Sequence, residues 1–314
     1  MAVFLITGAA GFIGGHLAEY LCGLGHEVRG YDNLSTGNRE NLAACKIQLI
    51  EADITDSVAM RAALRGCDGV FHLAAVASIQ AYAQDWASSS RTNLEGCLTV
   101  FEEAARANIP VVYASSTAVY GNPISLPLTE NMPTQPISGY GIDKLSNELH
   151  ATAMQDAIGL QATGLRFFNV YGPRQVSGSM YSGVITIFLE RWLAKQPVTI
   201  FGDGSQTRDF IYVGDIVQAL ALAMENIATC KGAVFNICTG KSISISELVK
   251  TISECMNTEI QVELAAAKAG DVQSSSGSGT AAQKAFGFLA YTDLKKGLEQ
   301  TISWISRPNK LKEN

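Results

Sequence analysis

The segment that decides the fold is Val3-Phe-Leu-Ile-Thr-Gly8-Ala-Ala-Gly11-Phe-Ile-Gly14, near the start of the chain. A short apolar run leads directly into three spaced glycines, and the amphipathic run Phe12 to Leu24 follows. This order is the context of a dinucleotide fingerprint, because the glycines let backbone N–H groups approach a pyrophosphate at a helix N-terminus. A glycine-rich turn that serves packing alone would have the same spacing, so the interpretation needs support from residues further along.

Short apolar runs alternate with longer amphipathic runs through the first half of the chain, a pattern typical of βαβ units. We expect strands at Val3 to Thr7, Glu27 to Tyr31, Ile47 to Glu51, Gly69 to His72, Val111 to Ser115 and Gln161 to Arg166. We expect helices at Phe12 to Leu24, Ser57 to Leu64, Thr92 to Asn108 and Tyr140 to Ile158. The fold class is therefore α/β, a Rossmann-type doubly wound parallel sheet with a smaller C-terminal α/β domain.

The predicted domains are a Rossmann domain at residues 1–168, which carries the dinucleotide fingerprint, and a domain mainly at residues 169–314, with some segments crossing back to the first. After about residue 168 the pattern becomes less regular, and stretches rich in Gly, Ser and Pro separate short helices and strands. Loops of this kind often carry function when a rigid scaffold positions them.

Composition excludes several classes of protein. The chain has 314 residues, 47% of them hydrophobic, and a formal net charge of -6, so it has no excess of basic charge for a nucleic acid partner. The seven cysteines are scattered and form no C-x-x-C pair, which argues against a disulfide framework and a zinc site. We expect no metal, reduced thiols and a cytoplasmic location. The first apolar run stops at Gly8, too early for a signal peptide or a membrane span.

Asp32 supports the dinucleotide interpretation because it ends the second expected strand. A carboxylate there can accept both hydroxyls of an adenosine ribose, and it would repel the 2'-phosphate of NADP. NAD is therefore the favoured cofactor. Asp53, after the third expected strand, is a candidate partner for the adenine amino group, although it could equally cap the next helix.

Tyr140 and Lys144 are four residues apart in an expected helix, so their side chains share one face. An unperturbed tyrosine has a pKa of about 10, and a neighbouring cation favours its phenolate. Ser115, Ser116 and Thr117 end an expected strand just upstream, where open α/β sheets place their ligands. A hydroxyl there could orient a substrate oxygen that gives its proton to Tyr140.

The whole set resembles the extended short-chain dehydrogenases, and among them the NAD-dependent nucleotide-sugar epimerase/dehydratase family. The resemblance covers essentially the full chain. It is carried by Gly8-x-x-Gly11-x-x-Gly14, Asp32-Asn-Leu-Ser-Thr-Gly37, His72-Leu-Ala-Ala75, Ser115-Ser-Thr-Ala-Val-Tyr-Gly121, Tyr140-x-x-x-Lys144, Arg166-Phe-Phe-Asn-Val-Tyr-Gly-Pro173 and Phe201-Gly-Asp-Gly-Ser-Gln-Thr-Arg208-Asp-Phe.

The resemblance implies a role for each matching residue. Tyr140 is the acid/base, Lys144 binds the nicotinamide ribose and lowers the tyrosine pKa, and Ser116 with Thr117 orients the sugar hydroxyl. The implied cofactor contacts are Gly8, Gly11, Phe12, Ile13, Gly14, Asp32, Asn33, Ser35, Thr36, Gly37, Asp53, Ile54, Leu73, Ala74, Ala75, Asn93, Tyr140 and Lys144. The implied substrate contacts are Ser78, Ser116, Asn169, Phe201, Arg208, Asp271 and Ser275.

Within this family the sequence favours 4-epimerisation of a UDP-sugar. Dehydrating and decarboxylating members keep an acid just after the serine/threonine, whereas this chain has Thr117-Ala118. Without an acid/base at C5 and C6, oxidation and re-reduction at C4 through a 4-keto sugar remains. A UDP-glucuronate epimerase or decarboxylase is the alternative, and a nucleotide-sensing scaffold is the non-enzymatic one.

The predictions about sugar specificity and the oligomeric state rest on the resemblance alone. A small residue at the position of Ser275 admits N-acetyl sugars, whereas a bulky aromatic residue restricts them. An Arg that commonly binds the diphosphate near this motif is absent, and Lys268 is the nearest cation. The helices Thr92 to Asn108 and Tyr140 to Ile158 correspond to those that pair in family homodimers.

Overall fold

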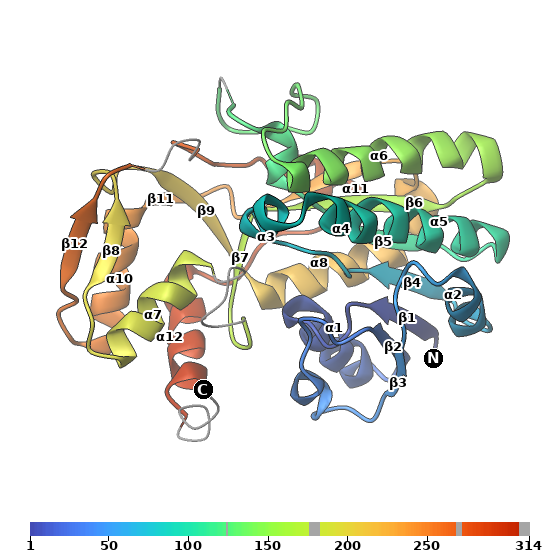
Figure 1. Cartoon of the computed structure of the whole chain (residues 1–314), viewed down its shortest axis with the longest axis horizontal. Coiled ribbons are helices and arrows are strands. Elements are labelled where there is room, and N and C mark those ends of the chain that lie inside the picture. Colours follow the sequence, from blue (N-terminus) through green and yellow to red (C-terminus); the bar gives the residue numbers. More distant parts are fainter. Residues whose placement is uncertain (124, 176–182, 268–271, 308–314) are drawn as a thin grey trace.

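The computed structural model describes residues 1–123, 125–175, 183–267 and 272–307 (Figure 1). Its centre is a seven-stranded parallel sheet with the strand order β10-β6-β5-β4-β1-β2-β3. The chain runs outward in one direction from β1 to β3 and in the other from β4 to β6. The predicted doubly wound Rossmann-type sheet is confirmed.

The strands and helices that build this sheet fall close to their expected positions. The strands are β1 (Val3–Thr7), β2 (Glu27–Asp32), β3 (Gln48–Glu51), β4 (Gly69–His72), β5 (Val111–Ser116), β6 (Ala162–Phe167) and β10 (Val234–Ile237). The helices are α1 (Phe12–Gly23), α2 (Ser57–Leu64), α3 (Ile79–Gln84), α4 (Trp86–Ser90), α5 (Gly96–Arg106), α6 (Gly139–Ile158), α8 (Val213–Glu225), α9 (Ile227–Cys230) and α11 (Thr280–Phe286). Short irregular turns of helix are η1 (Arg39–Leu42), η2 (Arg91–Glu95) and η3 (Thr117–Tyr120).

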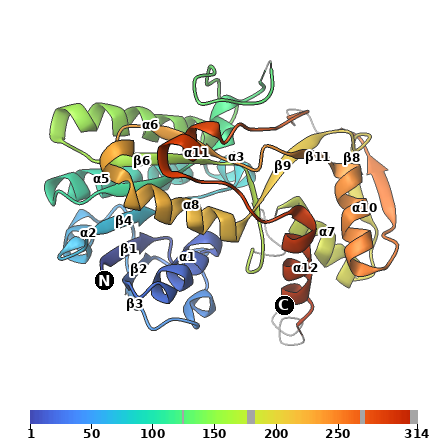
Figure 2. The same ribbon diagram turned by 180° about the vertical axis from the view of Figure 1, so that it is seen from behind.

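Helices cover both faces of the sheet, which explains why the central strands β1 and β4 are largely apolar. Helices α2, α5 and α6 lie on one face, and α1, α8 and α11 lie on the other, as the two opposite views show (Figures 1 and 2). Leu5 packs on the first face and its neighbour Ile6 on the second, as expected for a strand whose side chains alternate.

The sequence pattern missed the seventh strand. β10 lies far along the chain but pairs in parallel with β6, so this segment returns to the first sheet. Such a return was expected in general, but four residues of apolar sequence in a mixed region give no clear strand signal. The domain boundary at residue 168 itself stays a prediction.

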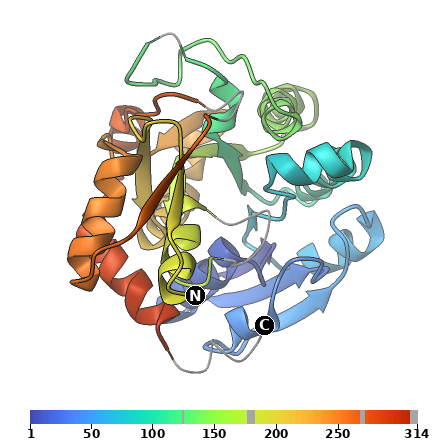
Figure 3. The same cartoon turned by 60° about the vertical axis from the view of Figure 1, so that its left-hand side comes forward.

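A smaller α/β unit lies next to the carboxyl ends of the main sheet's strands (Figure 1). It contains β7 (Asn169–Tyr171), β8 (Val198–Phe201), β9 (Thr207–Tyr212), β11 (Ser242–Ser244) and β12 (Val262–Ala265), with α7 (Val184–Leu193), α10 (Ile245–Met256) and α12 (Leu294–Ile305). Its strands form a three-stranded sheet in the order β11-β9-β7 and a parallel pair β12-β8. Figure 3 shows these yellow, orange and red elements gathered on one side of the blue strands. Among the described residues, no helix combines the length and apolar character needed to cross a membrane.

A buried polar cluster binds α6 to the sheet. Arg166 on β6 makes two hydrogen bonds to Glu148 on α6, of 2.9 and 2.7 Å, and a third of 2.8 Å to the hydroxyl of Tyr120. The side chains of Arg166 and Glu148 are only 5% and 6% exposed. Ser115 also donates to Glu148, and Tyr120 donates to Asn236 on β10. The cluster therefore links α6, β5, β6 and β10.

We predict that Glu148→Ala lowers the free energy of unfolding by about 3–5 kcal/mol, because it leaves the buried Arg166 guanidinium without its partner. Urea unfolding of wild type and variant measures this difference. Glu102→Ala is the matched control, since it removes an exposed ion pair with Arg106 that should be worth less than about 1 kcal/mol. Equal losses in the two variants would contradict the prediction.

Candidate active site

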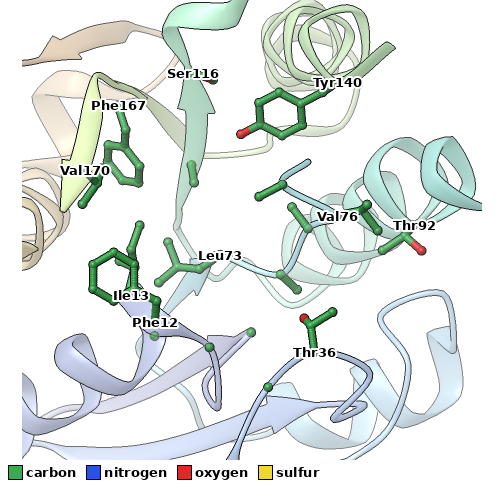
Figure 4. Close-up of a pocket in the computed structure, with 18 of the residues that line it drawn as sticks. Phe12, Ile13, Thr36, Leu73, Val76, Thr92, Ser116, Tyr140, Phe167 and Val170 are labelled. Atoms are coloured by element: carbon green, nitrogen blue, oxygen red, sulfur yellow. The ribbon is translucent and has the colours of Figure 1, made fainter. Parts of the chain in front are cut away.

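A cavity of about 490 Å³ opens at the carboxyl ends of the sheet strands (Figure 4). Residues that end β1, β2, β4, β5 and β6 contribute to its walls. It lies where the strand order reverses between β1 and β4, which is the position at which open α/β sheets bind their ligands.

The glycine turn forms the floor of this cavity. Gly8 has φ +70°, and a Cβ atom there would lie 2.7 Å from the backbone nitrogen of Ala74. A Cβ atom on Gly14 would lie 2.1 Å from the carbonyl oxygen of Gly8. Helix α1 follows at Phe12. Its N-cap residue, Gly11, has no side chain with which to cap the first N–H groups of the helix. The first N–H groups of α1 therefore suit the pyrophosphate that the fingerprint predicts.

Asp32 lines the same cavity at the end of β2. Its Oδ2 accepts a hydrogen bond of 2.9 Å from the backbone N–H of Ala10, and its Oδ1 accepts one of 2.8 Å from Leu34. These bonds fix the carboxylate beside the glycine turn, and each oxygen keeps a lone pair for a further donor. The carboxylate can therefore accept hydrogen bonds from both free hydroxyls of an adenosine ribose.

Most of the expected cofactor contacts meet at this cavity. Its lining includes Gly8, Gly11, Phe12, Ile13, Gly14, Asp32, Asn33, Ser35, Thr36, Gly37, Ile54, Leu73, Ala74 and Ala75, together with Tyr140 and Lys144. Asp53 and Asn93 are not among the described lining residues, and their roles toward the cofactor stay predictions. Asp53 accepts a hydrogen bond of 2.8 Å from Asn33, and Asn93 binds both the N–H and the carbonyl of Val76.

Ser116 and Tyr140 face one another across the opposite end of the cavity (Figure 4). Ser116 ends β5 and caps η3, where its Oγ accepts from the N–H of Ala118. Tyr140 stands in the first turn of α6, and a side-chain hydrogen bond joins it to Ser116. Thr117 also lines the cavity. The two hydroxyls can therefore share one substrate oxygen.

Burial controls the protonation of this site. It raises the pKa of Tyr140, and the hydrogen bond from Ser116 works in the opposite direction. The ammonium of Lys144 lies 5.8 Å from the centre of the Tyr140 ring and donates a 2.7 Å hydrogen bond to the carbonyl of Ala114. The effect of Lys144 on the tyrosine pKa, which the resemblance implies, stays a prediction.

The same burial lowers the pKa of Lys144, while Cys97, Asp143 and Glu148 act to raise it. Asp143 is itself buried, and it accepts hydrogen bonds from Tyr82 at 2.5 Å and Ser90 at 3.1 Å. Lys144 is therefore a buried amine between two carboxylates on its own helix.

The expected substrate residues divide into two groups. Ser116 and Asn169 line the cavity described above. Arg208 and Ser275 lie together in the smaller unit, because the N–H of Ser275 bonds to the carbonyl of Thr207, next to Arg208 on β9. Phe201 is partly exposed at the end of β8, and Ser78 caps α3 by accepting from the N–H of Ala81. Asp271 lies outside the described residues.

Sequence reasoning missed an apolar wall. Phe167, Phe168 and Val170 line the cavity at and just after the carboxyl end of β6, and Val76 lies across from them (Figure 4). The position after a parallel strand was a usable signal for the first three. Gln175 also lines the cavity. Among the described residues, no group of three or more His, Cys, Asp or Glu side chains is placed to bind a metal.

Residues 4–238 match the model of the NAD dependent epimerase/dehydratase family. The chain belongs to this family. The predicted family, the enzyme class and the NAD cofactor are thereby confirmed, and the glycine turn with Asp32 is the part of this chain that fits NAD.

Three similar proteins extend the comparison. UDP-glucose 4-epimerase of Mycolicibacterium smegmatis is 34% identical over 96% of this chain and 97% of its own length. The structure of UDP-glucose 4-epimerase from Thermotoga maritima with UDP-glucose has a TM-score of 0.91 at 35% identity, covering 96% of this chain and 98% of that one. A UDP-N-acetylglucosamine 4-epimerase from Methanobrevibacter ruminantium, solved with UDP-N-acetylmuramic acid, has a TM-score of 0.92 at 33% identity, covering 97% and 98%.

Proposed function

We propose that the chain is an NAD-dependent 4-epimerase of UDP-sugars, acting on UDP-glucose/UDP-galactose and on UDP-N-acetylglucosamine/UDP-N-acetylgalactosamine. The observation that carries this proposal is the distribution of charge around the cavity. Among its described lining residues the carboxylate is Asp32, next to the glycine turn, and the cation is Lys144. Near Ser116 and Tyr140 the lining thus supplies an acid/base for one hydroxyl, without a carboxylate for chemistry at C5 and C6.

The residues of this chain perform the proton half of the reaction. Ser116 orients the sugar 4-hydroxyl. Tyr140, in its phenolate form, takes the proton of that hydroxyl and later returns it. The positive charge of Lys144 stabilises the phenolate of Tyr140 while the tyrosine is without its proton. NAD, when bound, supplies a reversible hydride acceptor for C4. The product of this half-reaction is a 4-keto sugar, which must turn over before hydride returns to its other face.

The apolar wall suits that rotation. Phe167, Phe168 and Val170 offer contact area without directional hydrogen bonds, so two orientations of the sugar ring cost similar free energies. The nucleotide must then be held firmly elsewhere. Asn169 and Arg208 have the amide and guanidinium donors that suit a diphosphate.

A 4-epimerase or decarboxylase of UDP-glucuronate is the second candidate. A C6 carboxylate would need a cation, but Lys144 is already bonded to Ala114 and lies on the Tyr140 side of the cavity. The charge distribution of the described lining therefore favours a neutral C6 group.

Incubation with a panel of UDP-sugars, without added NAD and with separation of the products, tests the proposal. We expect interconversion of glucose and galactose forms, and of their N-acetyl forms, but no reaction of UDP-glucuronate. Turnover of UDP-glucuronate alone, or release of carbon dioxide from it, would replace this function by the second candidate. No reaction with any sugar would favour a nucleotide-sensing protein.

Tyr140→Phe keeps the ring and removes the proton acceptor. We predict a fall in kcat of about 100-fold or more, the usual contribution of general acid/base catalysis, with the NAD content unchanged. Tyr291→Phe is the control, because Tyr291 is exposed and outside the cavity lining. Near-normal turnover in Tyr140→Phe would refute the role assigned to this residue.

Ser275→Tyr tests the sugar specificity. If Ser275 borders the sugar, the added ring excludes the acetamido group and spares UDP-glucose, because only the larger ligand meets a steric clash. The measurement is the ratio of kcat/KM for the two substrates, which we expect to shift by about 10-fold or more toward UDP-glucose. Ser278→Tyr, the same change at a half-buried serine further along this loop, should leave the ratio unaltered. An unaltered ratio in Ser275→Tyr would mean that this side chain does not face the sugar.

We also propose a homodimer that pairs α5 and α6 with the same helices of a second copy. Ile142 and Leu149 are exposed on α6, and Trp86 is exposed on the neighbouring α4. An apolar surface of this kind is typical of an interface.

We predict that Leu149→Arg converts the dimer to a monomer, as measured by sedimentation velocity. Leu289→Arg is the matched control. Leu289 is 60% exposed, close to the 63% of Leu149, but Leu289 lies away from α5 and α6. A monomeric wild type would exclude the proposal.

The cysteines support a cytoplasmic location as part of this proposal. All seven thiols are free, and Cys67, Cys97, Cys230 and Cys238 are buried. Free thiols in this number are typical of a reducing compartment.

A further inference from the structure

Arg174 follows the motif Asn169-Val-Tyr-Gly-Pro173 and makes three contacts with the cofactor half of the molecule. Its Nη1 donates a 3.0 Å hydrogen bond to the carbonyl of Asn41, and its Nη2 lies 3.0 Å from Nδ1 of His16. The guanidinium also forms an ion pair with Glu19. These partners lie on α1 and at the end of η1, more than 130 positions away in the sequence.

His16 contacts the same loop a second time. Its Nε2 lies 2.8 Å from the carbonyl of Pro173, so Nε2 must carry the proton and donate. Nδ1 is then free to accept from Arg174, which makes the neutral ring the form that fits both neighbours. Burial lowers the pKa of His16 to about 4; the Pro173 carbonyl and Glu19 work against this shift, and Arg174 adds to it. The ring is therefore neutral near pH 7.

The backbone of Arg174 is unusual as well. Its φ is +67°, in the left-handed region that side-chain-bearing residues disfavour. Such a conformation persists only where surrounding contacts determine it, and it is often found at functional sites. Here the contacts to His16, Glu19 and Asn41 supply that constraint.

The two segments joined by Arg174 both line the candidate active site. Helix α1 begins at the glycine turn, whereas Asn169, Val170 and Gln175 line the substrate side of the same cavity. Gln175 is held in turn by a hydrogen bond of 3.1 Å to the carbonyl of Val170 and one of 2.8 Å from Thr186. Arg174 itself lines a separate hollow behind this site, with His16, Glu19 and Pro173, so it can influence substrate only through the loop.

We propose that Arg174 is a positioning residue that fixes the loop Asn169–Gln175 to the cofactor helix α1, and so sets the distance between the nucleotide-sugar contacts and the pyrophosphate turn. This inference rests on the proposed function and assigns to it a residue that touches neither substrate nor cofactor. It makes a joint prediction: loosening the loop weakens substrate binding, while the glycine turn and its NAD stay in place.

Arg174→Gly removes the guanidinium contacts without adding backbone strain, because glycine accepts the positive φ. Arg174→Lys keeps the charge but not the planar group of donors. Arg39→Ala is the matched control, since it removes an exposed ion pair with Glu51 in the same part of the molecule. Glu19→Gln removes the charge of one partner and should act in the same direction as Arg174→Gly, but less strongly.

Three readouts are measured on the purified holoenzyme: KM and kcat with UDP-glucose, Kd for UDP by calorimetry, and hydrogen exchange of the amides in 169–175. In Arg174→Gly we expect KM and Kd to rise by about 10-fold or more, a usual effect of misplacing a contact, with bound NAD retained. Amides of 169–175 should exchange faster, whereas those of β6 and α8 should not. Arg174→Lys should be intermediate and Arg39→Ala unchanged.

Each result decides between positioning and general stabilisation. Unchanged KM, Kd and exchange in Arg174→Gly would overturn the inference, as would faster exchange throughout the sheet with loss of NAD. If wild type neither binds UDP nor epimerises any UDP-sugar, the proposed function fails, and faster exchange confined to 169–175 still decides whether Arg174 fixes this loop.

Discussion

The ion pair between Glu148 and Arg166 is the interaction on which the rest of the site depends. Glu148 lies one helical turn after Lys144, which lies one turn after Tyr140, so the three side chains share one face of α6. Arg166 fixes that face against β6 in a region with little water, where a charged hydrogen bond is strong and a misplaced one is costly. The position of the Tyr140 hydroxyl therefore depends on a pair of charges that lie outside the described cavity lining.

This arrangement explains why motif spacing was more informative than apolar periodicity for α6. The face of α6 that meets the protein includes Asp143, Lys144, Asn147 and Glu148, all of them buried. A prediction based on apolar residues alone would place such a face toward solvent. The Tyr140–Lys144 spacing identified it correctly, because two residues one turn apart must share a face whatever lies opposite. The partners of that face, Arg166, Ser115 and Asn93, depend on tertiary contacts that one sequence does not contain.

The same limit separates the expected cofactor residues that line the cavity from those that do not. Gly8, Gly14 and Asp32 line it, and their local geometry is set by neighbours a few residues away, in a turn and a strand end. Asp53 and Asn93 have the right chemistry for ligand contacts, yet their hydrogen bonds go to Asn33, Val76 and Tyr82. Strand β10 is a further case, since its four residues become a strand only by pairing with β6. The protonation of Tyr140 likewise depends on how deeply α6 buries it, which its distance from Lys144 along the chain does not reveal.

A 4-epimerase has to meet two opposing demands, and the distribution of side chains in this chain suits both. The nucleotide must be held so that C4 returns to the same place, whereas the sugar must be free to present its other face. Directional donors gather at the glycine turn, at Asn169 and on β9, while Phe167, Phe168 and Val170 form an apolar wall beside Ser116 and Tyr140. An apolar wall restrains position without fixing orientation, because dispersion has little angular preference. Firm placement must then come from the loop that carries Asn169, and a loop is rigid only where something ties it down. The contacts of Arg174 with His16, Glu19 and Asn41 tie that loop to helix α1, which begins at the glycine turn. They therefore fix the position of the Asn169 side of the site relative to the glycine turn.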